Sequence, residues 1–115
     1  MCSIIGYSGK NPAAPILVKG LQKMEYRGYD SVGIATESEN KIVLKKGVGR
    51  VVEVNNAVKL DSIPGNIGIG HTRWATHGKV TEKNAHPHPS NSGKIAIVHN
   101  GIIENFEELK SDLQN

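Results

Sequence analysis

The sequence contains a single cysteine, Cys2, among its 115 residues. One thiol cannot form an internal disulfide, which excludes a disulfide-stabilised secreted domain, and the N-terminus lacks the charged start and apolar run of a secretory signal. Long apolar runs are also lacking: the longest, residues 13–18, is interrupted by Pro15, whereas a bilayer-spanning helix needs roughly 20 residues. We therefore expect a cytoplasmic protein with no membrane-inserted segment.

Aromatic residues make up only 4% of the chain, and the formal net charge is only +3. The basic residues are scattered among acidic ones rather than gathered into a stripe. Proteins that bind nucleic acid neutralise phosphates with clustered cations and stack bases on aromatic rings. The composition therefore excludes nucleic acid as the expected partner.

The apolar pattern predicts a small α+β domain. With 37% hydrophobic residues in 115, the chain can build one modest core and hence one domain at most. Strands are predicted at residues 3–7, 32–36 and 42–45, and a glycine-spaced strand at 67–71. The segment "KIAIVHNG", residues 94–101, predicts a buried strand that ends in a turn.

Helices are predicted between these strands. Residues 13–24 carry apolar side chains at helical spacing, and Pro15 is tolerated because it falls in the first turn. Residues 48–59 fit a helix face by spacing and a strand by their valine content, and we favour the helix. A last helix is predicted at residues 106–113, with Asn105 as its N-cap.

Cys2 stands immediately behind the initiator methionine. Cells remove Met1 when a small residue such as cysteine follows, and a thiolate is a strong nucleophile near neutral pH. A lone cysteine is more often a small buried hydrophobic residue than a catalyst. The position of Cys2 therefore raises the hypothesis of an N-terminal nucleophile without establishing it.

Four further segments gather chemically versatile residues at the ends of predicted elements. They are "EYRGYDS" (25–31), "HTRWATHG" (71–78), "NAHPHPS" (84–90) and "VHNGIIEN" (98–105). Taken singly, Arg73 fits a surface ion pair, Trp74 a core or rim aromatic, and Asn100-Gly101 a tight hairpin turn. Five histidines are present, but no HExxH or paired Cys/His spacing accompanies them, so we expect no metal and no cofactor.

Taken together, Cys2 and these segments, in this order, closely resemble the N-terminal glutaminase domain of the glutamine–fructose-6-phosphate aminotransferase family, over essentially the whole chain. Other class II glutamine amidotransferases share the leading cysteine and the Asn-Gly pair, but the "EYRGYDS" and "RWATHG" wording is similar to the sugar enzyme. One departure is Ser3, where the family has glycine. The resemblance implies the four-layer αββα sandwich of N-terminal-nucleophile hydrolases, with its first half in this chain.

The resemblance also implies a mechanism of glutamine hydrolysis. Loss of Met1 frees the α-amine of Cys2, which titrates at about 7.7 to 8.0 and can accept a proton from a thiol of pKa about 8.5. The thiolate then attacks the side-chain amide of glutamine, giving a thioester and ammonia. The Asn100 side chain and the Gly101 N–H match the family's oxyanion hole.

Substrate binding is likewise implied by the matching positions. Arg73 corresponds to the residue that grips the α-carboxylate of L-glutamine, a role suited to a planar, two-pronged cation. The rest of that substrate-binding loop comprises Trp74, Thr76 and His77. His86 and Arg27 match positions that can couple the glutaminase to the sugar-isomerising domain.

The resemblance implies partners beyond these residues. The sugar-isomerising domain lies outside this chain, and the full-length enzyme is expected to be a homo-oligomer. We expect residues 1–115 to be an incomplete glutaminase with negligible activity, because the family's further glutamine-anchoring aspartate matches none of Asp30, Asp61 and Asp112. The alternatives are the glutaminase part of another class II amidotransferase, or a non-catalytic fragment or binding module.

Overall fold

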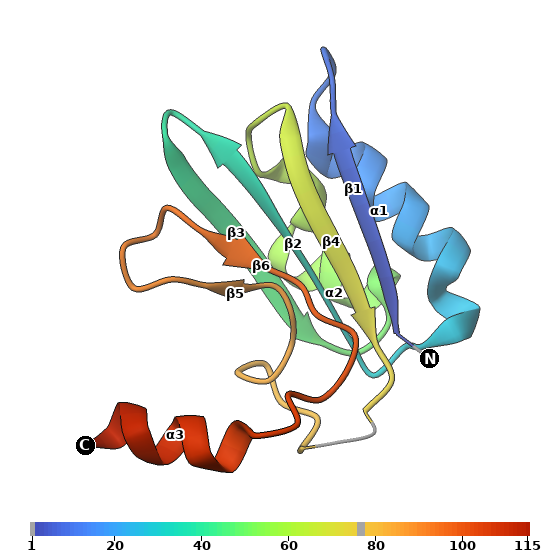
Figure 1. Cartoon of the computed structure of the whole chain (residues 1–115). Coiled ribbons are helices and arrows are strands. Elements are labelled where there is room, and N and C mark those ends of the chain that lie inside the picture. The colour runs from blue at the N-terminus through green and yellow to red at the C-terminus, as the bar shows by residue number, and fades with distance from the viewer. Residues whose placement is uncertain (1, 76–77) are drawn as a thin grey trace.

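The computed structural model describes residues 2–75 and 78–115 of the chain. Its main feature is a four-stranded antiparallel sheet in the order β1-β4-β2-β3, and a two-stranded sheet, β5-β6, lies beside it (Figure 1). The strands are β1 (Ser3–Ser8), β2 (Ser31–Ser38), β3 (Lys41–Val48), β4 (Ile67–Arg73), β5 (His88–Pro89) and β6 (Ala96–Ile97). The helices are α1 (Ala13–Met24), η1 (Glu25–Arg27), α2 (Val51–Val58), η2 (Leu60–Ser62) and α3 (Phe106–Gln114).

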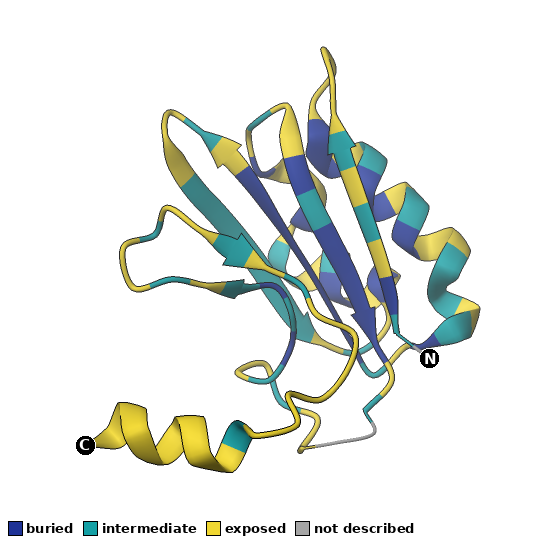
Figure 2. Ribbon diagram, in the orientation of Figure 1, coloured by how far each residue is buried: buried dark blue, intermediate teal, exposed yellow. Residues whose placement is uncertain are grey.

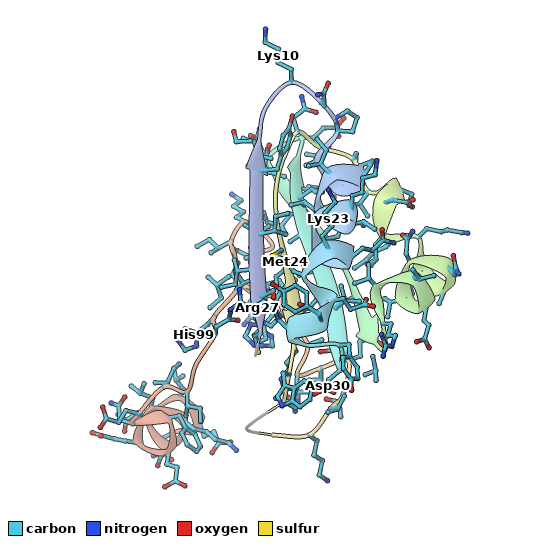
Figure 3. All side chains as sticks on the ribbon, turned by 90° about the vertical axis from the view of Figure 1, so that its right-hand side faces the viewer. Lys10, Lys23, Met24, Arg27, Asp30 and His99 are labelled. Carbon is cyan, nitrogen blue, oxygen red and sulfur yellow. The ribbon has the colours of Figure 1, made fainter. Side chains whose placement is uncertain are left out.

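The core lies between the four-stranded sheet and helices α1 and α2, which cover the same face of the sheet (Figures 1 and 3). Leu17 and Leu21 of α1 are fully buried there, together with Val32 and Ile34 of β2. Their spacing explains both elements, because residues four apart share a helix face and residues two apart share a strand face. Burial of these apolar side chains is the main force that holds α1 on the sheet.

Two glycines of β4 allow α1 to approach the sheet closely. A Cβ added at Gly68 would lie 2.8 Å from Leu17 Cδ1, and one added at Gly70 would lie 3.0 Å from Leu21 Cδ1. Contacts this short are rare for real Cβ atoms, so the leucine side chains or the helix that carries them would have to shift. The glycine spacing of β4 thus sets the distance between helix and sheet.

The opposite face of the sheet is only partly covered. The β5-β6 hairpin lies on this side, and α3 extends away from the body below it (Figures 1 and 3). Ile4 and Ile67 remain exposed on the sheet, and no residue of α3 is buried. Figure 2 shows α3 almost entirely as exposed surface. Apolar surface of this extent on one side distinguishes the open face from the packed, helix-covered face.

Most predicted elements are confirmed. The helices at 13–24 and within 48–59 are present as α1 and α2, and the helix predicted at 106–113 is present as α3. The strands predicted at 32–36 and 42–45 are longer in the structure, because β2 and β3 pair along their full length from Ser31↔Val48 to Ser38↔Lys41. The α+β class is therefore confirmed.

One local prediction is wrong. The segment "KIAIVHNG" is not a buried strand: only Ala96 and Ile97 are in strand conformation, and Ile97 is 57% exposed. Its partner segment contains Pro87 and Pro89, which have no N–H to donate, so the ladder stays short. Asn105 is the N-cap residue of α3, as predicted, although its side chain makes no capping hydrogen bond.

The elements also bear on membrane insertion. Among the described residues, no helix is long and apolar enough to cross a membrane.

Candidate active site

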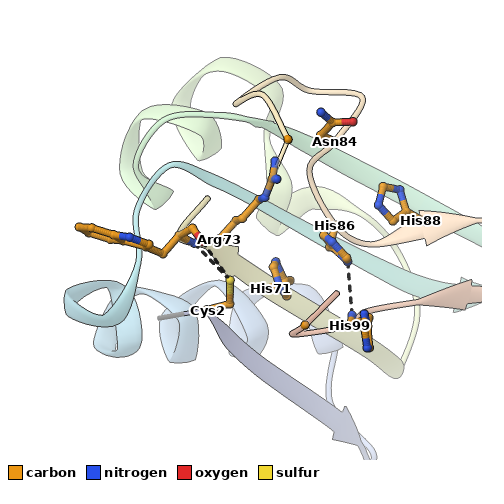
Figure 4. A pocket seen from close by; sticks show the side chains of 10 residues that line it. Cys2, His71, Arg73, Asn84, His86, His88 and His99 are labelled. Atoms are coloured by element: carbon orange, nitrogen blue, oxygen red, sulfur yellow. Dashed lines mark hydrogen bonds between the residues drawn. The ribbon is translucent and has the colours of Figure 1, made fainter. Parts of the chain in front are cut away.

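Cys2 lies at the start of β1, at the end of the sheet where the loops that follow β4 and β6 come together (Figure 4). A pocket of about 310 Å³ opens beside it. The lining residues come from both ends of the chain and from its middle: Cys2, His71, Arg73, Trp74, Gly78, Asn84, His86, His88, His99 and Gly101. The pocket therefore contains most of the described residues that the sequence nominated.

The thiol of Cys2 is held by the backbone of Trp74. The Trp74 N–H donates to Sγ over 3.3 Å, and Sγ lies 3.5 Å from the Trp74 carbonyl oxygen. Pairing of Ser3 with Thr72 in the β1-β4 ladder brings these residues, 72 apart in sequence, to the same point. The sulfur therefore has both a backbone donor and a backbone acceptor within reach, and both belong to Trp74.

Arg73 is the last residue of β4 and is 8% exposed. Its Nη1 donates to the carbonyl oxygen of Lys79 over 3.0 Å, which holds the guanidinium against the loop at residues 78–79. Arg73 lines the same pocket as the thiol. A nearly buried guanidinium in a pocket is a strong binding group for a carboxylate.

The loop after β4 is shaped by Asp30, a residue that sequence reasoning assigned only to a loop. The Asp30 Oδ2 atom accepts the N–H of Ala75 over 2.6 Å, while the Asp30 N–H donates to the Arg73 carbonyl oxygen over 2.8 Å. Next to it, the ring of Tyr29 packs edge-on against Trp74 at 5.6 Å. The "EYRGYDS" segment therefore supports the pocket wall. In the sequence, the polar side chain of Asp30 directly before β2 is the feature that could have indicated this role.

Asn100 and Gly101 form the turn on the opposite side of the thiol. Asn100 Oδ1 lies 2.7 Å from Nε2 of His71, a buried residue of β4. Gly101 has φ of 150° and lines the pocket. At that φ a side chain would be strained, so glycine suits the position. Gly101 thus presents an unobstructed backbone to the pocket, whereas Asn100 is not itself a lining residue and is connected to the pocket through its contact with His71.

Three histidines stack along one wall. The rings of His71 and His86 lie 4.4 Å apart and nearly parallel, and His86 and His88 are also 4.4 Å apart, at a tilt. The pKa of His86 is lowered from 6.5 to about 4, chiefly by burial and further by the positive charges of the neighbouring histidines, Arg73 and Lys46. Burial also lowers the pKa values of His71 and His88. The wall is therefore neutral at cellular pH.

This neutrality predicts a pH-dependent stability. Unfolded histidines bind protons near pH 6.5, whereas folded His86 resists protonation down to about pH 4, so the unfolded state gains protons first as the pH falls. The stabilisation is complete above pH 6.5 and is lost progressively toward pH 4. We expect the urea midpoint to fall from pH 7 to pH 5, and to fall less in His86→Phe, which keeps a ring but cannot titrate. An equal fall in both proteins would contradict this origin.

Some predicted site residues do not line this pocket, and two lie outside the residues that the structure describes. Arg27 lies in η1 and is not among the lining residues (Figure 3). Thr76 and His77 lie outside the described residues. Within residues 2–75 and 78–115, no group of three histidine, cysteine, aspartate or glutamate side chains is arranged to hold a metal ion.

Ser3, the departure from the family pattern, fits without strain. It lies in β1, and its φ is not among the positive values of the described non-glycine residues, which are Glu39, Asn40 and Lys59. Its hydroxyl is buried on the helix-covered side and lies 3.5 Å from the carbonyl oxygen of Met24. A side chain at this position therefore points away from the pocket.

No family model matches the chain. Curated relatives include the glutamine–fructose-6-phosphate aminotransferases (isomerising) of Pyrococcus horikoshii, 58% identical over 98% of this chain, and Clostridium acetobutylicum, 54% identical over all of it. The relative from Bacteroides thetaiotaomicron is 55% identical over 99% of the chain. The chain spans only 19% of the length of each of these relatives.

Solved structures give a consistent result. The Bacillus subtilis glutamine phosphoribosylpyrophosphate amidotransferase matches 99% of this chain with a TM-score of 0.82 and 32% identity, and 25% of that protein is covered. A structure titled as the allosteric regulatory enzyme of purine biosynthesis matches with a TM-score of 0.83. The resemblance inferred from the sequence is confirmed, and the chain has the mixed helix-and-sheet fold of N-terminal-nucleophile glutamine amidotransferases.

Proposed function

We propose that this chain is the glutamine-hydrolysing part of a glutamine–fructose-6-phosphate aminotransferase. The observation that carries the proposal is the meeting of Cys2, Arg73 and the Asn100-Gly101 turn at one pocket, although they belong to separate segments of the chain. Identities of 54% to 58% with relatives of that name favour this enzyme over an amidotransferase of purine synthesis, where the identity is 32%.

Hydrolysis begins with removal of Met1, which makes the α-amine of Cys2 available as a base. The amine takes the thiol proton, and the sulfur attacks the carbonyl carbon of the glutamine side-chain amide. The oxyanion that forms is stabilised by the Asn100 amide and the Gly101 N–H. Collapse of this intermediate breaks the C–N bond, with the proton passing to the leaving nitrogen. Ammonia departs, and water then hydrolyses the thioester to glutamate.

Binding is assigned to the loop after β4. The guanidinium of Arg73 pairs with the α-carboxylate of glutamine, and Trp74, Thr76 and His77 complete the substrate loop. His86 and Arg27 are assigned to coupling with a sugar-isomerising domain, where the ammonia converts fructose 6-phosphate to glucosamine 6-phosphate in hexosamine synthesis. None of these steps uses a cofactor.

The reactive thiol and the relatives bear on where the protein works and on its assembly. An active thiol must remain reduced, so we assign the protein to the cytoplasm, where thiols are kept reduced. We also propose that the natural-length protein, meaning a protein of the relatives' length that includes this chain, is a homo-oligomer. We expect residues 1–115 alone to be inactive. Because the chain covers 19% of its relatives, the natural-length protein is the material for every test below.

Covalent labelling tests the proposal. A glutamine analogue that carries an electrophilic carbon should modify the natural-length protein at one site, Cys2, and saturating glutamine should slow the reaction. Intact mass should show that Met1 is absent. The matched control is Cys2→Ala, which should remain unlabelled. Retention of Met1 in an active preparation, or no adduct at Cys2 under saturating reagent, would overturn the assignment.

A further inference from the structure

We propose that His71 is a positioning residue that holds the amide oxygen of Asn100 and thereby directs the amide N–H2 group, rather than the oxygen, at the reacting carbonyl. The inference rests on the proposed function, because it concerns the same oxyanion site. It goes further by naming the group that decides which end of the Asn100 amide is available. An amide can donate to an oxyanion only through its nitrogen, so a reversed amide would oppose the reaction.

The geometry supports a directed contact. His71 Nε2 lies 2.7 Å from Asn100 Oδ1, within the range of a good hydrogen bond. His71 is 1% exposed and lies in β4, between paired residues Ile4 of β1 and Gly33 of β2. Its ring is therefore fixed by a strand in the middle of the sheet. Asn100, in contrast, is exposed and lies in a loop, so it needs an external restraint.

The buried ring also decides the hydrogen-bond direction. Nδ1 of His71 has no hydrogen-bond partner among the described residues. If the amide were reversed, Asn100 would donate to Nε2 and the proton of the neutral ring would lie on Nδ1, as a buried N–H without an acceptor. Buried N–H groups without partners are rarer than buried acceptors without donors. The Nε2–H tautomer, with the amide oxygen as acceptor, is therefore favoured.

His71 stays neutral at cellular pH, so this tautomer preference holds. Burial is the main cause that lowers its pKa; positive charge on Arg73, and on His88 when that ring is protonated, lowers it too, while the hydrogen bond to Asn100 raises it. The facing groups are His86 on the stacked side and Arg73 on the same strand, and neither is an acid. The ring stays neutral at cellular pH and donates from Nε2.

A second contact restrains the same turn from the other side. His86, stacked on His71, accepts the backbone N–H of His99 at Nδ1 over 3.3 Å. The loop that carries His86 reaches the sheet because Gly33 has no side chain there, and an added Cβ would collide with the His86 carbonyl oxygen. Lys46 then holds the loop through the carbonyl oxygens of Ala85 and Pro87. The stacked pair thus restrains both the backbone and the side chain of the turn.

Kinetics of the natural-length protein test this role. His71→Phe keeps a ring for the stack but loses the donor, and His71→Gln keeps an N–H donor without the ring. We expect kcat for glutamine hydrolysis to fall roughly 10- to 100-fold in His71→Phe, with KM unchanged. Losses of this size are typical when a residue that orients a functional group through a hydrogen bond is removed. His71→Gln should recover a substantial part of the lost kcat. Alkylation of Cys2 by iodoacetamide, which forms no oxyanion, should be unaffected in both variants.

A double-mutant cycle separates positioning from a purely structural role. If His71 acts through Asn100, adding His71→Phe to Asn100→Ala should reduce kcat no further. The matched control is Thr72→Val, a nearly isosteric change at the next buried position of β4 on the helix-covered face, which should retain kcat.

The possible failures are distinct. Wild-type kcat in His71→Phe, or full additivity with Asn100→Ala, would overturn the positioning role while the proposed function stands. Should His71→Phe fail to fold, a His71→Gln variant that folds but shows no better kcat than Asn100→Ala would also overturn it. Absence of both glutamine hydrolysis and Cys2 labelling in the wild-type protein would instead overturn the proposed function, and this inference with it.

Discussion

Replacing Cys2 by alanine is expected to abolish glutamine hydrolysis and leave the fold unchanged. Removing a covalent nucleophile from a triad enzyme costs on the order of 10⁶ in kcat, and no other described cysteine can substitute. The side chain is only half-buried and forms hydrogen bonds to the backbone of Trp74, so little packing is lost. Ammonia release measured over hours should not exceed the uncatalysed background.

Ser3→Gly provides the matched control at the neighbouring position. It restores the family residue and removes only a small buried side chain, whose hydroxyl has a long contact to Met24, so activity should persist. Thermal unfolding should show closely similar midpoints for Cys2→Ala and the wild type. Substantial glutaminase activity in Cys2→Ala would contradict the assignment of the nucleophile, whatever the stability.

The second large effect is expected at Asn100. Asn100→Ala removes a donor that matters chiefly when the oxyanion forms, so kcat should fall about 100- to 1000-fold with little change in KM. Asn100→Asp is a sharper variant, because a carboxylate still accepts from His71 but cannot donate to an oxyanion. We expect its kcat to be at least as low. Steady-state kinetics with glutamine as the varied substrate measures both constants.

Arg73→Ala serves as the contrasting variant in the same assay. Its contact with the glutamine carboxylate exists in the ground state and the transition state alike, so the loss should be found mainly in KM. The roles assigned to the two residues are wrong if Asn100→Ala changes KM and Arg73→Ala changes only kcat.

The sequence by itself determined the elements on the helix-covered side of the sheet. The apolar spacing of residues 13–24 is sufficient to predict α1 with its observed bounds, and the glycine spacing near residue 68 marks β4. These elements are local: each buried face is written in the order of its own residues, with period 3.6 or 2. The motif order also identified Cys2, Arg73 and Asn100 as candidates, through its resemblance to the glutaminase family.

Long-range contacts were decided by the tertiary structure alone. The pairing of Ser3 with Thr72 puts Cys2 against Trp74, and no periodicity in either segment encodes that register. The same limit explains the wrong prediction of a buried strand at 94–101: its pattern is apolar, but its partner segment lacks N–H groups. Strand pattern predicts burial only when a partner can supply the ladder.

The histidine wall shows the same division at the site. The sequence places His71 and His86 in separate segments, and the resemblance gave only His86 an expected role, in coupling to the sugar-isomerising domain. Only the fold stacks their rings at 4.4 Å, because Gly33 admits the His86 loop to the sheet beside His71. Their low pKa values and their contacts with the 99–101 turn follow from that burial. Residue type and order therefore determined which groups could react, whereas packing between distant segments decided which groups hold them in place.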